Sequence, residues 1–80
     1  FDAVVSGVSE WGLFIEERTT RAEGLIRIRN LGQDYFELEP KKYRLVGKAT
    51  KKTYSLGDIV KVKVMAVDLD RKMIDYALVA

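Results

Sequence analysis

The feature that most constrains the fold is a succession of short strand-like segments separated by turn residues, with almost no helical periodicity. The clearest segment covers residues 59–67, where valines alternate with Lys61 and Lys63. Such alternation is typical of a strand with one buried face and one face in solvent. Similar segments lie at residues 1–8, 11–17, 23–29 and 73–79. Strands spaced about 10–15 residues apart and joined by turns favour a small barrel or sandwich.

The stretch between the third and fourth of these strands has a different character. Residues 34–39 fit one helical or 3-10 turn with Asp34 as its cap, and Pro40 ends it. Residues 42–46 and 52–56 look like two short strands, which predicts a hairpin. Five main strands with such an insert match the OB-fold, a Greek-key barrel. We therefore expect an all-β, five-stranded antiparallel OB-fold barrel with a helical turn and a small basic hairpin inserted between strands 3 and 4.

Length and composition narrow the choice further. With 80 residues and no Cys or His, the chain has no disulfide framework, Cys nucleophile or ordinary zinc site. No apolar run approaches the roughly 20 residues of a membrane span, so we expect no membrane association. Because Phe1 already opens a strand, we expect residues 1–80 to be a single domain excised from a larger chain. The lack of cysteine fits a cytoplasmic protein.

The charge is unevenly distributed along the chain. The formal net charge is +2, but residues 1–40 carry −4, residues 41–63 carry +7 and residues 64–80 carry −1. A local basic block attracts polyanions more strongly than the mean charge suggests. The alternative interpretation of this block is a lysine-rich loop that is simply solvated.

Aromatic and arginine side chains are predicted to share the outer face of the barrel. The alternation places Phe14 opposite to the core side of its strand, and Trp11 lies at the entrance of that strand. Arg27 and Arg29 are expected on the matching face of the neighbouring strand. Aromatic faces stack on unpaired bases, and arginine pairs with phosphates or stacks on bases. This set predicts a surface for single-stranded nucleic acid, unless Trp11 and Phe14 fill the core or plug a barrel end.

Two further pairs of charged residues are weaker candidates. Lys61 and Lys63 lie two residues apart on the polar face of a strand and could line a phosphate track, or be ordinary surface lysines. Asp68 and Asp70 flank a turn and could hold Mg²⁺, but no third ligand is evident and turn aspartates are common. Phosphate loops, nucleophile elbows and metal-spacing motifs are absent from the sequence. An autonomous nuclease is therefore disfavoured.

Two aromatic residues stand in the irregular segment. Tyr35 and Phe36 are expected to pin the insert onto the barrel. The alternative is that they add stacking surface at the edge of the nucleic-acid site.

These residues together resemble a known family. Residues 1–16, 23–28 and 57–64 resemble the S1-type RNA-binding domain, which has the OB-fold. The insert at residues 34–38, 43–47 and 53–58, and the ending at residues 68–76, are similar to the S1 domain of the ribonuclease R branch of the ribonuclease II exoribonucleases. The resemblance covers essentially the whole chain.

The resemblance implies a set of RNA-binding positions. The family's nucleic-acid face falls on Trp11, Phe14, Arg27, Asp68 and a basic residue that is either Arg71 or Lys72. Members often have His at the position of Arg27 and Ser two residues later, so that Arg27 and Arg29 make this site more basic. Ala3 stands where many members have Gly.

The resemblance also implies a function. Enzymes of this branch degrade RNA processively from the 3′ end to nucleoside 5′-monophosphates, with Mg²⁺ held by Asp residues of a separate catalytic domain. We expect this fragment to be no enzyme and to hold no cofactor, but to grip single-stranded RNA and guide it to that domain. The other domains of the parent, the ribosome and RNA-decay proteins are the further expected partners.

Two alternatives remain open. OB-folds host many functions, so the chain could be a protein-interaction module that docks an acidic partner or another parent domain through residues 41–55. It could also be an S1 domain of another RNA-processing or translation protein.

Overall fold

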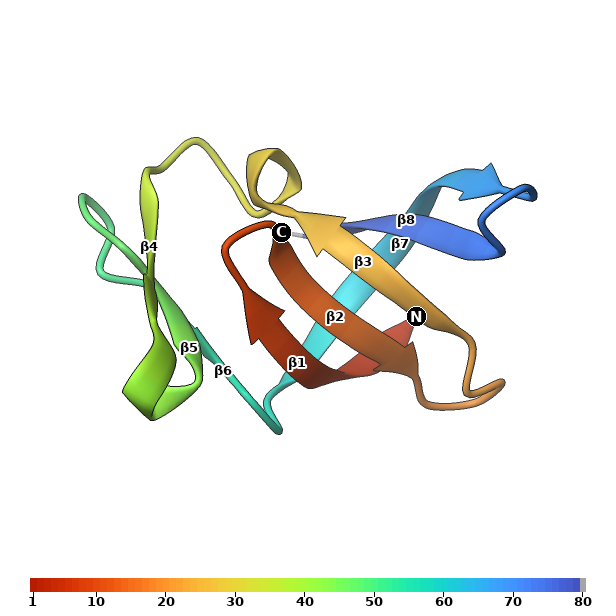
Figure 1. The fold of residues 1–80 in the computed structure, drawn as a ribbon, viewed down its shortest axis with the longest axis horizontal. Coiled ribbons are helices and arrows are strands. Elements are labelled where there is room, and N and C mark those ends of the chain that lie inside the picture. Colours follow the sequence, from red (N-terminus) through yellow and green to blue (C-terminus); the bar gives the residue numbers. More distant parts are fainter. Residues whose placement is uncertain (80) are drawn as a thin grey trace.

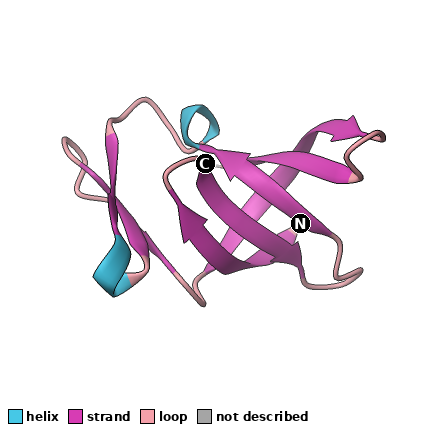
Figure 2. Ribbon diagram, in the orientation of Figure 1, coloured by secondary structure: helices cyan, strands magenta, loops and turns pink. Residues whose placement is uncertain are grey.

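The computed structural model describes residues 1–79 and shows a closed barrel beside a small second sheet (Figure 1). The barrel strands are β1 (Asp2–Ser9), β2 (Gly12–Glu17), β3 (Glu23–Arg27), β7 (Ile59–Asp68) and β8 (Met73–Leu78). The second sheet holds β4 (Phe36–Glu39), β5 (Arg44–Gly47) and β6 (Thr53–Ser55). Two short 3-10 helices, η1 (Ile28–Asn30) and η2 (Pro40–Lys42), are the helical elements of this described part (Figure 2).

The barrel confirms the predicted all-β fold, with the strand order β1-β2-β3-β8-β7. Neighbouring strands are antiparallel with one exception: β3 and β8 pair in parallel, from Gly24 opposite Ile74 to Ile26 opposite Tyr76. A parallel pair needs a long connection, and the whole insert together with β7 supplies it. The expectation of an entirely antiparallel barrel therefore misses this closing pair.

One core serves both sheets. Fully buried side chains of the barrel, such as Leu13, Ile15 and Ile26, belong to the same cluster as Leu45 and Phe36 of the small sheet. Burial of such side chains is worth about 1.5–3 kcal/mol each. The insert is thereby fixed to the barrel, and Figure 1 shows its sheet standing against one side of it.

The insert differs from its prediction in one respect. Residues 36–39 form the strand β4, paired with β5 from Phe36 opposite Gly47 to Glu39 opposite Arg44, and not a helical turn. The predicted 3-10 turn of the insert is present as η2, which Pro40 begins and does not end. Asp34 caps no helix. Its carboxylate accepts hydrogen bonds from the backbone N–H groups of Tyr35, Ala49 and Thr50 and from the Thr50 hydroxyl. These bonds, with that of the Thr50 hydroxyl first, hold the pKa of Asp34 well below its usual range.

The other expectations for the insert fare differently. The hairpin is confirmed as β5 and β6, with Leu45 opposite Tyr54. Phe36 is buried in the core that it shares with barrel side chains such as Leu13, so it pins the insert onto the barrel as expected. Within the insert, its ring centroid lies 5.9 Å from that of Tyr54. Tyr35 is 68% exposed, so its predicted anchoring role is wrong. It lies instead beneath the Lys48 ammonium group, 5.3 Å from the ring centroid.

Glu17, at the end of β2, is the charged side chain most deeply buried in the described chain, at 3% exposure. Its carboxylate accepts hydrogen bonds from the backbone N–H groups of Thr19 (3.0 Å) and Thr20 (2.6 Å) and from the Thr20 hydroxyl. The hydroxyl bond is the largest cause, and together they lower the pKa of Glu17 to about 2. The turn between β2 and β3 is thus held by an ionised carboxylate.

Acid is expected to weaken the fold through this group. Because the folded pKa is depressed from 4.5 to about 2, the stabilisation is complete above pH 4.5 and is lost as the pH falls through 2. Urea titrations over this pH range should show a smaller loss of unfolding free energy for Glu17→Gln than for wild type. Glu23→Gln, which changes an exposed carboxyl at the start of β3, is the matched control. Parallel pH curves for wild type and Glu17→Gln would contradict the assignment.

No helix of the described residues 1–79 is long and apolar enough to cross a membrane.

Candidate functional site

A row of residues crosses the outer face of the barrel. The strand registers place Gly7, Phe14, Leu25, Asp75 and Ala66 directly opposite one another in turn, from β1 through β2, β3 and β8 to β7. Side chains at paired positions share one face of a sheet. Because the residues flanking Phe14 are fully buried, Phe14 is directed outward, with 37% of its surface exposed.

The ring of Phe14 is supported from below by the backbone of β1. A Cβ atom built on Gly7 would lie only 3.3 Å from Cδ2 of Phe14. Because glycine has no side chain, the Phe14 ring can lie over the backbone at this position. Ring atoms so placed are backed by the barrel on one side and remain accessible on the other. This arrangement suits stacking of a flat partner.

Trp11 lies at the turn between β1 and β2 and is 69% exposed. The backbone N–H of Trp11 donates a hydrogen bond to Oγ of Ser9 (3.2 Å), and the backbone carbonyl of Trp11 accepts one from the N–H of Ile28 (3.2 Å). The backbone is therefore fixed while the indole stays outside the core. The structure rules out the alternative in which Trp11 fills the core.

Arg27 lies at the end of β3, opposite Gly12 of β2. Its Nε lies 3.5 Å from Oδ1 of Asp75 and is itself buried, without a hydrogen-bond partner among the described residues. The side chain as a whole is 43% exposed. The inner end of the guanidinium is thus held by the barrel surface, while its outer end remains available to a ligand.

The strand alternation that predicted Arg29 on this face ends before it reaches Arg29. Strand β3 ends at Arg27, and residues 28–30 form η1. The period of two that predicted Arg27 and Arg29 on one face therefore stops at residue 27. Arg29 is exposed on η1.

Asp75 is a site residue that sequence reasoning missed. Its position between Ile74 and Tyr76 on β8 indicates that it faces outward, since Tyr76 is buried. Only the parallel register of β3 and β8, however, places it beside Arg27.

The two lysines of β7 are exposed on either side of the buried Val62. They have different neighbours. Lys63 lies opposite Ala77 of β8, and Lys61 lies opposite Asp2 of β1. They point to the same outer face but approach different parts of the surface.

In the last turn, Arg71 and Lys72 have different neighbours. The Asp68 carboxylate accepts the N–H groups of Asp70 and Arg71 at 3.1 Å each, and Nε of Arg71 lies 3.7 Å from its other oxygen. Asp68 therefore shapes the turn and pairs with Arg71. Lys72 lines a hollow of about 240 Å³ together with Phe14 and Glu23, so it is the basic residue beside the aromatic face. No group of three or more acidic, His or Cys side chains that could hold a metal gathers among residues 1–79.

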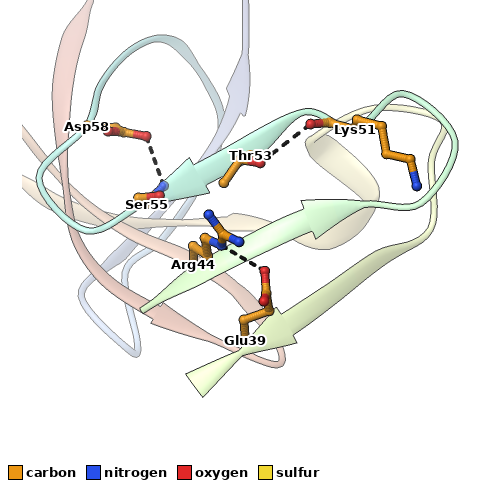
Figure 3. A network of polar contacts seen from close by, with 6 residues as sticks. All are labelled: Glu39, Arg44, Lys51, Thr53, Ser55 and Asp58. Atoms are coloured by element: carbon orange, nitrogen blue, oxygen red, sulfur yellow. Dashed lines mark hydrogen bonds and ion pairs between the residues drawn. The ribbon is translucent and has the colours of Figure 1, made fainter. Parts of the chain in front are cut away.

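The basic block of the insert is partly neutralised by β4. Nε of Arg44 lies 2.7 Å from Oε1 of Glu39, and Nζ of Lys48 lies 2.9 Å from Oε1 of Glu37. Figure 3 shows the Arg44–Glu39 pair bridging β5 and β4, with the Lys51 side chain extending away from the sheet. The Thr53 hydroxyl donates to the carbonyl of Lys51 (3.4 Å), which orders this turn.

Comparison with known proteins gives the family context. The S1 RNA binding domain family matches residues 1–78. Ribonuclease R of Vibrio parahaemolyticus is 41% identical over 78 residues, which are 98% of this chain and 9% of that protein. Ribonuclease R of Escherichia coli K12 is 35% identical over 80 residues, which are 100% of this chain and 10% of that protein. The chain thus spans about a tenth of the length of the curated relatives it matches.

Solved structures give the same result for the fold. The apo form of Mycoplasma genitalium RNase R superposes with a TM-score of 0.91 and 29% identity, over 99% of this chain and 12% of that one. A second structure, with the same TM-score of 0.91, holds that protein in complex with ribose methylated single-stranded RNA.

Proposed function

Because this chain belongs to the S1 RNA-binding domain family, with a match to the S1 domain of ribonuclease R, we propose that it grips single-stranded RNA for a 3′–5′ exoribonuclease. The observation that carries the proposal is the outward, backbone-supported ring of Phe14 within reach of Arg27 and Lys72. A structural neighbour bound to single-stranded RNA supports the same ligand class.

The binding mechanism follows from the chemistry of this face. An unpaired base stacks on Phe14, and Trp11 at the adjacent turn offers a second aromatic surface; each stacked base is worth about 1–3 kcal/mol. Arg27 and Lys72 offer positive charge to the phosphates beside the aromatic residues, and Lys63 adds a further cation farther along the sheet, opposite Ala77 of β8. Stacking and phosphate contacts are sequence-tolerant, so the module binds many RNA sequences with an affinity near the micromolar range.

The rest of the proposal concerns a longer protein. We propose that the chain itself catalyses nothing, and that a separate catalytic domain with Mg²⁺ degrades the RNA that this module guides to it in the cytoplasm. Contact with other domains is supported by exposed apolar side chains near the tip of the β7–β8 hairpin, since the relatives are about ten times longer than this chain. These side chains are Val64, Met65, Val67 and Leu69. The ribosome and RNA-decay proteins are further proposed partners.

Trp11, the single tryptophan of the sequence, provides the direct test. Titration with unstructured single-stranded RNA should quench its fluorescence, because a base stacks beside the indole. The quenching should weaken between about 0.1 M and about 1 M salt, where the Debye length falls from ~10 Å to ~3 Å. Duplex RNA serves as the control. Unchanged fluorescence at the lower salt concentration would remove Trp11 from the binding face.

A further inference from the structure

A second hollow, of about 400 Å³, lies between the insert and the barrel. Its polar lining comes from Asn30 at the end of η1, Lys52 and Tyr54 of the insert, and Lys61 of β7. We infer that this hollow binds one backbone phosphate of the RNA strand whose base stacks on Phe14. The inference rests on the proposed function and extends the RNA path beyond the aromatic face.

The charge of the hollow matches this ligand. Lys52, just before β6 of the insert, and Lys61 of β7 in the barrel line the same space, and no described carboxylate lines it. Unlike Arg44 and Lys48, neither lysine forms an ion pair within the described part of the chain. Asp2 lies opposite Lys61 in the strand ladder but does not line the hollow. Two ammonium groups that form no ion pair with the described residues favour an anion in this space.

The neutral groups of the hollow are suited to the same role. Asn30 and Tyr54 are half-buried, and each can donate a hydrogen bond to a phosphate oxygen. Burial raises the pKa of Tyr54, so its hydroxyl remains protonated and available as a donor. Leu31 and Leu78 form the apolar wall and reduce the access of competing water.

Strand β7 connects this hollow with the aromatic face. Lys63 and Lys61 are successive outward residues, and two residues of a strand span about 6.6 Å. Lys63 lies opposite Ala77 of β8, and β8 is the strand that pairs with β3, which carries Arg27. A strand of RNA can therefore pass from Phe14 over Arg27 and Lys63 to the hollow. A path across the barrel from Phe14 to the hollow is consistent with the site size of about 4–16 nucleotides for one OB-fold.

The test compares two double variants that lose the same charge. Lys52→Gln with Lys61→Gln removes the ammonium groups of the hollow, whereas Lys41→Gln with Lys42→Gln changes two exposed lysines of η2 outside it. Binding of oligo(U) of about 12 nucleotides is measured over a salt series. The hollow variant should lose roughly tenfold in affinity at low salt. Its salt slope should fall by about 0.7, as expected for one phosphate lost from a single strand. Oligo(U) of about four nucleotides should bind the hollow variant nearly as well as it binds wild type, because so short an RNA does not reach the hollow.

The outcomes separate this inference from the proposed function. Equal losses in both double variants would mean general attraction and would overturn the phosphate site. If the salt slope of the hollow variant were unchanged while Phe14→Ala still weakened RNA binding, the phosphate site would be wrong and the proposed RNA-binding face would still hold. Intact RNA binding together with a lost acidic protein partner would make the hollow a protein-docking site instead. A wild type that binds no RNA at low salt would defeat both proposals. Urea midpoints verify that all variants fold.

Discussion

Replacing Phe14 by alanine is expected to weaken binding of single-stranded RNA by about 5- to 150-fold, which corresponds to the ~1–3 kcal/mol of one stacked base. The reason is geometric. The ring is directed outward, and its inner side covers the space left open by Gly7, so its outer side is a prepared stacking surface. Fluorescence anisotropy with a labelled unstructured RNA measures the change.

Two controls make this result specific. Tyr43→Ala removes another exposed aromatic ring, 63% accessible, which lies at the end of η2 on the insert. Lys51→Ala removes a basic side chain that extends away from the small sheet (Figure 3). Both should weaken binding less than Phe14→Ala. If Lys51→Ala were the more damaging change, the binding surface would lie on the basic insert and not on the aromatic face.

Local sequence patterns were sufficient for most of the barrel. The alternation in β2 and β7 correctly separates inward from outward residues, as for Phe14 and Lys61, because a period of two applies wherever one face of a strand is buried. The same rule does not extend to Arg29, which lies beyond the end of β3. Nothing in residues 23–29 shows that the strand stops at Arg27 and is followed by η1.

The features that sequence reasoning missed depend on contacts between distant residues. The stretch at Asp34 has a helix-cap pattern, but pairing of β4 with β5 and the bonds of Asp34 to residues 49 and 50 prevail over it. The register of β3 with β8 sets the position of Asp75 beside Arg27. The hollow between Lys52 and Lys61 likewise exists only once the insert has folded against the barrel. Such long-range pairings leave no local signal.

Gly12→Ala is expected to be the most damaging small change to the fold. Gly12 opens β2 with a φ of +146°, and a Cβ atom there would overlap the carbonyl oxygen of Ile26 and lie 3.0 Å from Cα of Arg27. The backbone strain costs about 1–3 kcal/mol, and the overlap should add about 1–3 kcal/mol because β3 must shift. A chain of this length has only about 4–12 kcal/mol of stability, so the loss is a large fraction.

Gly32→Ala is the matched control for this prediction. Gly32 has nearly the same φ, +141°, but a Cβ atom there meets nothing within 4 Å, so the change imposes the backbone strain without the overlap. Urea unfolding should therefore show a clearly larger loss for Gly12→Ala than for Gly32→Ala. RNA affinity should fall along with stability only in the Gly12 variant. Gly12 follows Trp11 in the chain and is paired with Arg27 of β3, so a change at Gly12 displaces both site residues. Equal losses of stability would show that the close approach of β2 to β3 does not require glycine.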